Sequence, residues 1–373
     1  NGTGTLNIAG DISNLGTLNA IDGTIAFIGK SAQSIPASTF STGLIKNLIV
    51  KNTAGVTMNS ATSLTGILTV NDGGSFNTND FLTLKSTASQ TAIIASVAGT
   101  VTGKMTIERY IPAKRAFRFL SSPTDGGTIR SNWMEDGVDV AGLGTDITGA
   151  GGASNGFDIS GSNNPSLFTY LNNNPGPGAN WNAVTSANIS QVAGVPYRML
   201  VRGDRLVDQT NNNATATATT LRTKGTIKYG DVSVADLNPV ADGFNLIGNP
   251  YQSPVNMYTL LNDASTTGIK KTFYTIWDPN VNTRGGYVTV TFAPLEVNDI
   301  VSVQDNTSPT NTGASRYLQP GQAAFVQTQV AGAPSLIFKE NQKALSFSNV
   351  FRQANAGQSK IRFTLYTANA LAN

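Results

Sequence analysis

The sequence predicts an all-β fold in two parts: a β-solenoid-like N-terminal region followed by a pseudo-duplicated β-sandwich domain. Helix signals are nearly absent, because no long stretch repeats apolar residues at i, i+3, i+4 and i+7. Short β-rich runs are instead separated throughout by Gly, Asn, Asp, Ser and Thr. A change in the spacing of these runs and a repeated series of strands then divide the chain into regions.

The solenoid-like region is predicted over residues 1–103. Short apolar runs begin at Leu6, Ile25, Leu48 and Ile67, about 19, 23 and 18 residues apart. A period near 20 residues with one short strand per period favours a solenoid, in which each turn buries its apolar face on the next. An ordinary antiparallel sandwich is the alternative for this region. Since Leu6 is already in the pattern, we expect further turns upstream in a longer chain.

The sandwich domain is predicted over residues 104–345, because four landmarks occur twice in the same order. The pattern F-x-[FL]-[LI]-[SG]-[SN]-P stands at Phe117–Pro123 and again 127 residues later, at Phe244–Pro250. In each case an aromatic strand, a strand led by proline and a closing strand follow. Val201 and Val326, on the proline-led strands, are 125 residues apart.

This repetition predicts two halves, about 104–235 and 236–345, which each supply one lobe or one sheet of the sandwich. The remaining segment, 346–373, reads as a polar linker followed by an alternating strand at Lys360–Tyr366. That strand either returns to the sandwich, opens the next module of a longer chain, or adds to a sheet of another copy.

The composition excludes several classes of chemistry. The 373 residues contain no His and no Cys, and only four Glu. His-dependent catalysis, imidazole and thiolate metal sites and disulfides are therefore excluded. The net charge of +3 is too weak to predict nucleic-acid binding, and no apolar run approaches the length of a membrane span. We expect neither an enzyme nor a resident cofactor.

Four segments carry a resemblance to a known group of proteins: Lys104–Trp133 (with RYIPAKRAFRFLSSP), Pro196–Asp204 (PYRMLVRGD), Gly243–Met257 (GFNLIGNPYQSPVNM) and Leu318–Thr328 (LQPGQAAFVQT). They resemble large cell-surface proteins of Bacteroidota that the type 9 secretion system exports, a group that includes gliding-motility adhesins and other repeat proteins.

The resemblance implies an extracellular location at the cell surface. It also implies contact with the secretion machinery during export, and other domains of the same longer chain as partners. Such proteins normally end in a C-terminal sorting domain, which we expect to have been cleaved or to lie beyond residue 373. The group has no shared catalytic motif, so no active-site residues follow from it.

Trp181 is the best candidate for a ligand contact. It lies in the loop sequence NNNPGPGANWN, whereas Trp133 and Trp277 have apolar neighbours and are predicted to be core. Sugars stack on exposed aromatic rings, and Asn180 and Asn182 would supply polar groups at the rim. The sequence therefore predicts contact with surface glycans here. The alternative is that Trp181 covers the sandwich edge.

Acidic residues in the glycine-rich segment are the best metal candidates. Asp136, Asp139 and Asp146 could offer the carboxylate oxygens that calcium prefers. Their spacing does not match an EF-hand loop, and solvated turn aspartates are the alternative. A glycosidase would need two facing carboxylates, such as Glu135 with Asp278 or Glu296, but nothing in the sequence links them.

A basic cluster surrounds Pro112 and includes Arg109, Lys114, Arg115 and Arg118. Since neighbouring strand residues face opposite sides, Arg118 is predicted to point outward, away from the side of Phe117 and Phe119. A solvated sheet face is the simplest interpretation. An anionic polysaccharide or a neighbouring domain would be the alternative partner.

These observations together predict a non-enzymatic extracellular segment of a large bacterial surface protein, with a solenoid stalk and an adhesion module. Two alternatives stay open. The sandwich could act as a carbohydrate-binding module, or the chain could assemble with copies of itself into an extracellular fibre.

Overall fold

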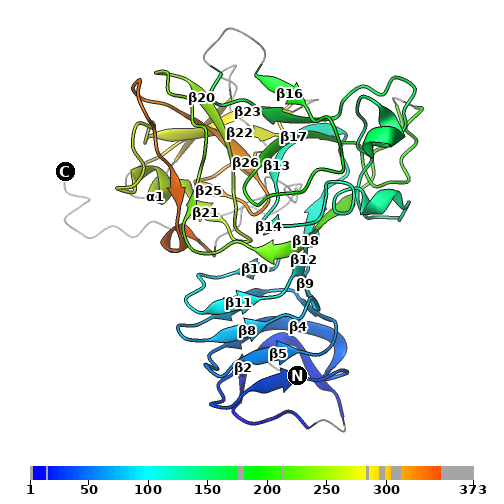
Figure 1. The fold of residues 1–373 in the computed structure, drawn as a ribbon, viewed down its shortest axis with the longest axis vertical. Helices are drawn as coiled ribbons and strands as arrows, with labels where there is room; N and C mark the ends of the chain where they lie inside the picture. The colour runs from blue at the N-terminus through cyan, green and yellow to red at the C-terminus, as the bar shows by residue number, and fades with distance from the viewer. Residues whose placement is uncertain are drawn as a thin grey trace, which may run out of the picture.

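A computed structural model describes residues 3–13, 16–174, 180–211, 213–282, 285–293, 299–303 and 312–345. Figure 1 shows a stack of solenoid turns below a broader head. The structure is nearly all β, with 42% strand and 5% helix, which confirms the predicted fold class. No helix among the described residues is long and apolar enough to cross a membrane. The linker and strand predicted within 346–373 lie outside the described residues.

The N-terminal region is a β-solenoid of about four turns, as predicted. One face is a ten-stranded sheet of order β1-β2-β4-β6-β9-β12-β18-β14, with β7 beside β4 and β10 beside β7. Its strands are β1 (Thr5–Ile8), β2 (Leu18–Phe27), β4 (Phe40–Val50), β6 (Thr62–Leu64), β7 (Ile67–Val70), β9 (Leu82–Leu84), β10 (Ile93–Ile94), β12 (Met105–Ile111), β14 (Thr124–Asp125) and β18 (Thr219–Ile227). The second face has the order β11-β8-β5-β3. Its strands are β3 (Gln33–Ile35), β5 (Val56–Met58), β8 (Ser75–Asn77) and β11 (Thr100–Thr102).

Alternating apolar residues produce these turns. Leu48 and Val50 on β4 are fully buried, and they pair in parallel with Leu68 and Val70 on β7, which are also fully buried. Contacts between successive turns join residues 20 to 26 positions apart, close to the predicted period. Each turn nevertheless contains strands of both faces rather than one. The strands of the second face are only three residues long, too short to be detected by alternation in the sequence.

The solenoid continues into the head without a break in its sheet. Strand β12 pairs in parallel with β9 of the solenoid and antiparallel with β18 of the head. Met105 and Ile107 on β12 belong to the solenoid's hydrophobic core. The sheet therefore runs through the predicted boundary at 103/104, and β18 covers the strand edge that the last turn would otherwise expose.

The head contains two sheets with the same strand order. The first half has the order β13-β17-β15-β16, and the second half has β20-β26-β22-β23-β24. The first sheet consists of β13 (Ala116–Ser121), β15 (Leu167–Tyr170), β16 (Trp181–Ala183) and β17 (Pro196–Val201). The second consists of β20 (Phe244–Gly248), β22 (Phe273–Asp278), β23 (Gly286–Thr291), β24 (Ile300–Val303) and β26 (Ala323–Gln327). This order matches the predicted duplication, with β24 as the addition in the second half.

Short elements complete the head around these sheets. Two small ladders pair β19 with β27 and β21 with β25. The bounds are β19 (Val232–Ser233), β21 (Val255–Asn256), β25 (Tyr317–Leu318), β27 (Ile337–Phe338), α1 (Met257–Asn262), and the 3-10 turns η1 (Glu135–Gly137), η2 (Gly152–Asn155) and η3 (Glu340–Gln342).

The strand register corrects the alignment of the two halves. Phe117 pairs with Leu200 on β17, and Phe244 pairs with Gln327 on β26, so both strands repeat at the same offset of 127 residues. Val326 is therefore equivalent to Met199, and not to Val201 as the sequence suggested. The prolines that lead the two strands were the misleading landmark. The better one is glycine: Gly194 and Gly321 are also 127 apart, and both have positive φ (80° and 68°).

Each sheet of the head has an outer and an inner face. The outer faces pack on separate cores, which include Met199 in the first half and Ile276 in the second. The inner faces meet through a smaller cluster around Phe119 and Phe325. The repeated motifs lie at this junction, because a Cβ at Gly248 would approach the Cβ of Ser121 to 2.7 Å. Glycine allows this close approach between the halves.

Candidate functional site

Aromatic side chains join the inner faces of the two sheets. Phe119 is 2% exposed, and its ring meets that of Phe325 edge-to-face, with centroids 5.4 Å apart. Phe325 also contacts Tyr170 at 5.0 Å and Phe244 at 5.9 Å. Edge-to-face contacts of this kind add stability beyond the apolar area that they bury. The two halves are therefore held together by rings and not by a broad aliphatic core.

One aromatic pair occurs in both halves. Tyr170 and Trp181 are opposite each other on β15 and β16, with ring centroids 5.0 Å apart. Trp277 and Tyr287 are opposite each other on β22 and β23, also at 5.0 Å. The sheet order makes these positions equivalent. The duplication therefore extends from strand order to a particular pair of side chains.

A cavity of about 440 Å³ opens between the halves beside these rings. Its aromatic walls come from both halves: Tyr170, Trp181, Phe244, Tyr287 and Phe325. We call it the aromatic cavity. Its volume falls within the roughly 300–1,000 Å³ typical of small-molecule sites.

Hydroxyl groups form a polar strip in the same cavity. Thr275, Thr289 and Ser302 lie across the neighbouring strands β22, β23 and β24, and all three line the cavity. The Thr275 and Thr289 hydroxyl oxygens are 2.9 Å apart. Aromatic faces with adjacent hydroxyls suit a ligand that has both apolar C–H faces and hydroxyl groups.

The three residues predicted to contact a ligand have different positions. Trp181 is half-buried and forms a wall of the aromatic cavity. Asn180 donates from Nδ2 to the Tyr170 hydroxyl at 2.9 Å, and so it positions a second wall. Asn182 is exposed, and strand alternation places it on the face of β16 opposite Trp181. The structure thus brings Trp181 and Asn180 to one site and leaves Asn182 outside it.

Sequence reasoning missed the other walls of the cavity. Phe244 begins the repeated motif and is 48% exposed. Phe325 and Tyr287 lie on strands that the sequence identified, but their faces depended on register. Arg198 was also missed, although its Cζ lies over the ring of Trp181 at 4.6 Å, that of Phe117 at 4.6 Å and that of Phe168 at 4.7 Å. A signal was available, because Phe244 and Phe117 are equivalent in the motif.

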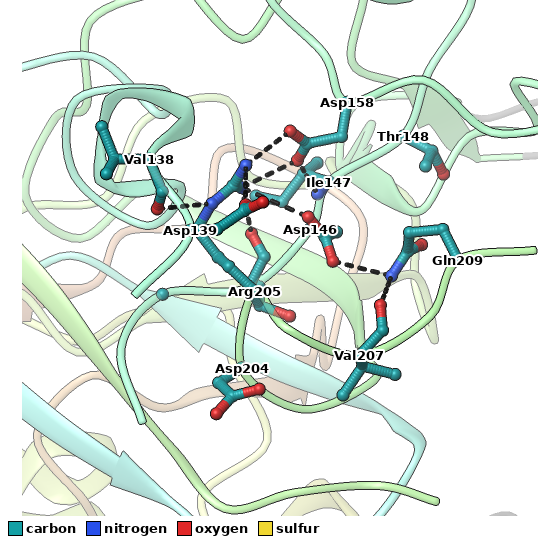
Figure 2. Close-up of polar contacts among 12 residues, drawn as sticks. Val138, Asp139, Asp146, Ile147, Thr148, Asp158, Asp204, Arg205, Val207 and Gln209 are labelled. Atoms are coloured by element: carbon teal, nitrogen blue, oxygen red, sulfur yellow. Dashed lines mark hydrogen bonds and ion pairs between the residues drawn. The ribbon is translucent and has the colours of Figure 1, made fainter. Parts of the chain in front are cut away.

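The predicted calcium ligands do not form a ligand set. Figure 2 shows Asp139 and Asp146 beside the guanidinium of Arg205, together with Asp158. Asp136 makes no ion pair with Arg205, and no group of three acidic side chains among the described residues is arranged to hold a metal. The segment does concentrate carboxylates as the sequence indicated. They surround a buried cation of the protein itself.

Arg205 ties together three loops of the first half. Its guanidinium donates to both carboxylate oxygens of Asp158, at 2.9 and 3.0 Å, and its Nε donates to the Val138 carbonyl at 3.0 Å. Asp146 lies 3.4 Å from the same guanidinium and accepts from Gln209 Nε2 at 2.7 Å. Burial, reinforced by the charge of Asp158, raises the pKa of Asp146 to about 7. The cluster is therefore sensitive to protonation as well as structural.

The paired carboxylates considered for a glycosidase are placed apart. Glu135 is held by Arg222, which donates from Nε at 3.0 Å, and it lines a different cavity. Asp278 is fully buried and accepts from the Thr312 hydroxyl at 2.5 Å. Glu296 lies outside the described residues. The aromatic cavity itself has no carboxylate among its described lining residues.

Arg118 corrects the prediction of a solvated basic face. It is 1% exposed, and its guanidinium donates to the carbonyls of Lys114, Ala116 and Pro112 at 3.1 to 3.2 Å. Alternation does separate it from Phe119, as expected, but the opposite face is covered by the turn before β13. Its role is to satisfy the backbone of that turn.

Comparison with known proteins identifies one family. The model described as "Domain of unknown function (DUF8693)" matches residues 153–369, more than half of the chain. The match includes every residue that lines the aromatic cavity and excludes the solenoid. No curated protein and no solved structure matches the chain.

Proposed function

The chain belongs to the family described as a domain of unknown function (DUF8693), and we propose that it is a non-enzymatic adhesive segment of a large bacterial surface protein. In this proposal the solenoid is a stalk and the head is the adhesion module. The carrying observation is the continuous sheet from β9 through β12 to β18, which joins the stalk to the head by backbone hydrogen bonds. The sequence resemblance to exported surface proteins supports an extracellular location.

A second set of contacts fixes the head on the stalk. The Glu340 carboxylate accepts from the Val97 N–H of the solenoid at 2.7 Å and from the Gly230 N–H at 2.9 Å. The Gln252 carbonyl accepts from the Ile94 N–H at 2.8 Å, and the Gln252 side chain donates back to the Ala92 carbonyl at 2.7 Å. Such a junction would transmit force rather than act as a hinge.

The stalk proposal is tested by a distance between spin labels on the stalk and the head. The chain has no cysteine, so labels at Lys30→Cys and Lys271→Cys, both exposed positions, report a single distance. We expect one narrow distribution from pulsed electron resonance, and a broader one when Glu340→Ala is added. A broad distribution in the parent pair would contradict a rigid stalk. Protease shaving of intact source cells tests the surface location separately.

The aromatic cavity favours a second, compatible function, in which the head binds carbohydrate. Trp181 and Tyr287 offer ring faces, and Thr275, Thr289 and Ser302 offer hydroxyls. On a glycan array we expect binding that Trp181→Ala abolishes. The matched control is Phe81→Ala, which removes a partly exposed ring from the solenoid and should leave binding unchanged. Equal binding by both variants would rule out this site.

Assembly into a fibre stays a prediction without a structural argument. The strand Lys360–Tyr366, which would add to a neighbouring sheet, lies outside the described residues. The secretion machinery and other domains of a longer chain are likewise partners that only the resemblance implies.

A further inference from the structure

We propose that the ligand of the head is an acidic saccharide, whose carboxylate or sulfate is bound by Arg198 beside the aromatic cavity. This inference rests on the carbohydrate-binding proposal and names the class of sugar. It is carried by the surroundings of one side chain, which differ from those of other buried arginines in the head.

Arg198 is held by aromatic rings and not by acceptors. Its guanidinium stacks over Phe117, Phe168 and Trp181, at 4.6 to 4.7 Å from each centroid. It forms no ion pair with a carboxylate of the described residues, and its Nε is hidden from solvent with no hydrogen-bond partner. An arginine offers five N–H donors in a planar fork. These donors are therefore available to an acceptor from outside the chain.

Two other arginines of the head show what a structural arginine looks like. Arg205 forms a bidentate pair with Asp158, and Arg118 donates to three backbone carbonyls. Both are at least 95% buried. Arg198 is only half-buried, so that its fork can meet a ligand from solvent. Burial lowers the pKa of Arg198, so a bound anion would also relieve the cost of a poorly solvated charge.

Arg198 and the aromatic cavity share a wall. Trp181 lines the cavity and is also one of the rings on which the guanidinium stacks. A sugar on the aromatic walls would therefore have its acidic substituent within reach of the fork. The described lining of the cavity contains no acidic residue that would repel it. Planar, bidentate recognition of a carboxylate or sulfate is the task for which arginine is suited.

The test compares saccharides that differ only in charge. Oligomers of galacturonic, mannuronic and glucuronic acid are paired with their fully methyl-esterified forms, and each is titrated calorimetrically into the intact chain. We expect the acids to bind roughly tenfold more tightly than the esters, because a charge-assisted pair is stronger than a neutral hydrogen bond. Raising the ionic strength should weaken only the acids.

Variants assign the discrimination to one residue. Arg198→Gln should bring the acids to the affinity of the esters, while the esters bind as before. Lys51→Gln, which removes an exposed charge from the solenoid, is the matched control and should preserve the preference. The parent-chain comparison and its salt dependence need no variant, so they stand even if Arg198→Gln fails to fold.

Each outcome separates this inference from the proposal beneath it. Equal binding of acids and esters, both lost in Trp181→Ala, would overturn the acidic class and leave the carbohydrate site standing. A preference for acids that Arg198→Gln retains would overturn the role of Arg198. Failure of every pair to bind would overturn the carbohydrate proposal and this inference together.

Discussion

The first half of the head packs a four-stranded sheet against the five-stranded sheet of the second half, and the same strand order places different residues at equivalent positions. At the offset of 127, Arg198 occupies the position that Phe325 occupies in the second half. Phe325 closes the contact between the sheets with its ring. Arg198 instead brings a cation and three aromatic partners to the edge of the same interface.

The difference indicates how a duplicated fold can acquire a site. The outer face of each half keeps an apolar core that stabilises it alone. The inner faces have diverged, and the cavity lies between them. The first half also contains a longer connection between β13 and β15, which supplies all three carboxylates around Arg205. In the second half Arg316 pairs with one carboxylate, that of Asp299, at 3.0 Å from its Nε.

The largest expected effect comes from the ring at the centre of the interface. Phe119→Ala should lower the free energy of unfolding by about 3–5 kcal/mol, because it leaves a cavity among four rings. Its equivalent, Leu246→Ala, has no ring contact to lose and should cost roughly 2–4 kcal/mol. Urea denaturation followed by fluorescence measures both. A larger loss for Leu246→Ala would show that the rings are not the dominant contact.

A smaller loss is expected from the buried arginine of the first half. Arg118→Met should cost about 2–3 kcal/mol, since buried carbonyls of the preceding turn lose their donors. Lys104→Met, at an exposed position, is the control and should change stability by less than about 0.5 kcal/mol. If the two variants melted at the same urea concentration, the turn would not depend on Arg118.

The carboxylates around Arg205 predict a pH dependence that belongs to the first half. The pKa of Asp146 is raised to about 7, above the value near 4 of an unfolded aspartate. Between these values the folded state holds the proton more tightly, so the free energy of unfolding falls as pH rises from about 4 to 7. Asp146→Asn has no proton to lose and should flatten this slope. Parallel curves for the parent and the variant would contradict the assignment.

The sequence predicted those features that repeat along the chain. Alternating leucines and valines such as Leu48 and Val50 revealed the solenoid, and the motif at Phe117 and Phe244 revealed the duplication. Features that depend on register could not be read in this way. The prolines suggested an offset of 125, and the true offset moves each inner-face residue of β26 to a different equivalent.

The candidate site was predicted in part for the same reason. Trp181 was identified because its loop is polar, which is a local signal. Arg198, Tyr287 and Phe325 become neighbours only when two sheets face each other, and no local pattern reports that. Arg118 was assigned to the correct strand face, but its burial depends on a turn that folds over that face.

The central claim is that the cavity between the halves is where the head binds saccharide. The most direct measurement is the set of indole N–H signals in a nitrogen-15 NMR spectrum, because the chain contains only three tryptophans. During titration with a bound saccharide, the Trp181 signal should shift first and most. Trp133, which is 3% exposed in the core of the first half, should not move. A shift at Trp133 with Trp181 unchanged would place the ligand elsewhere and contradict the account.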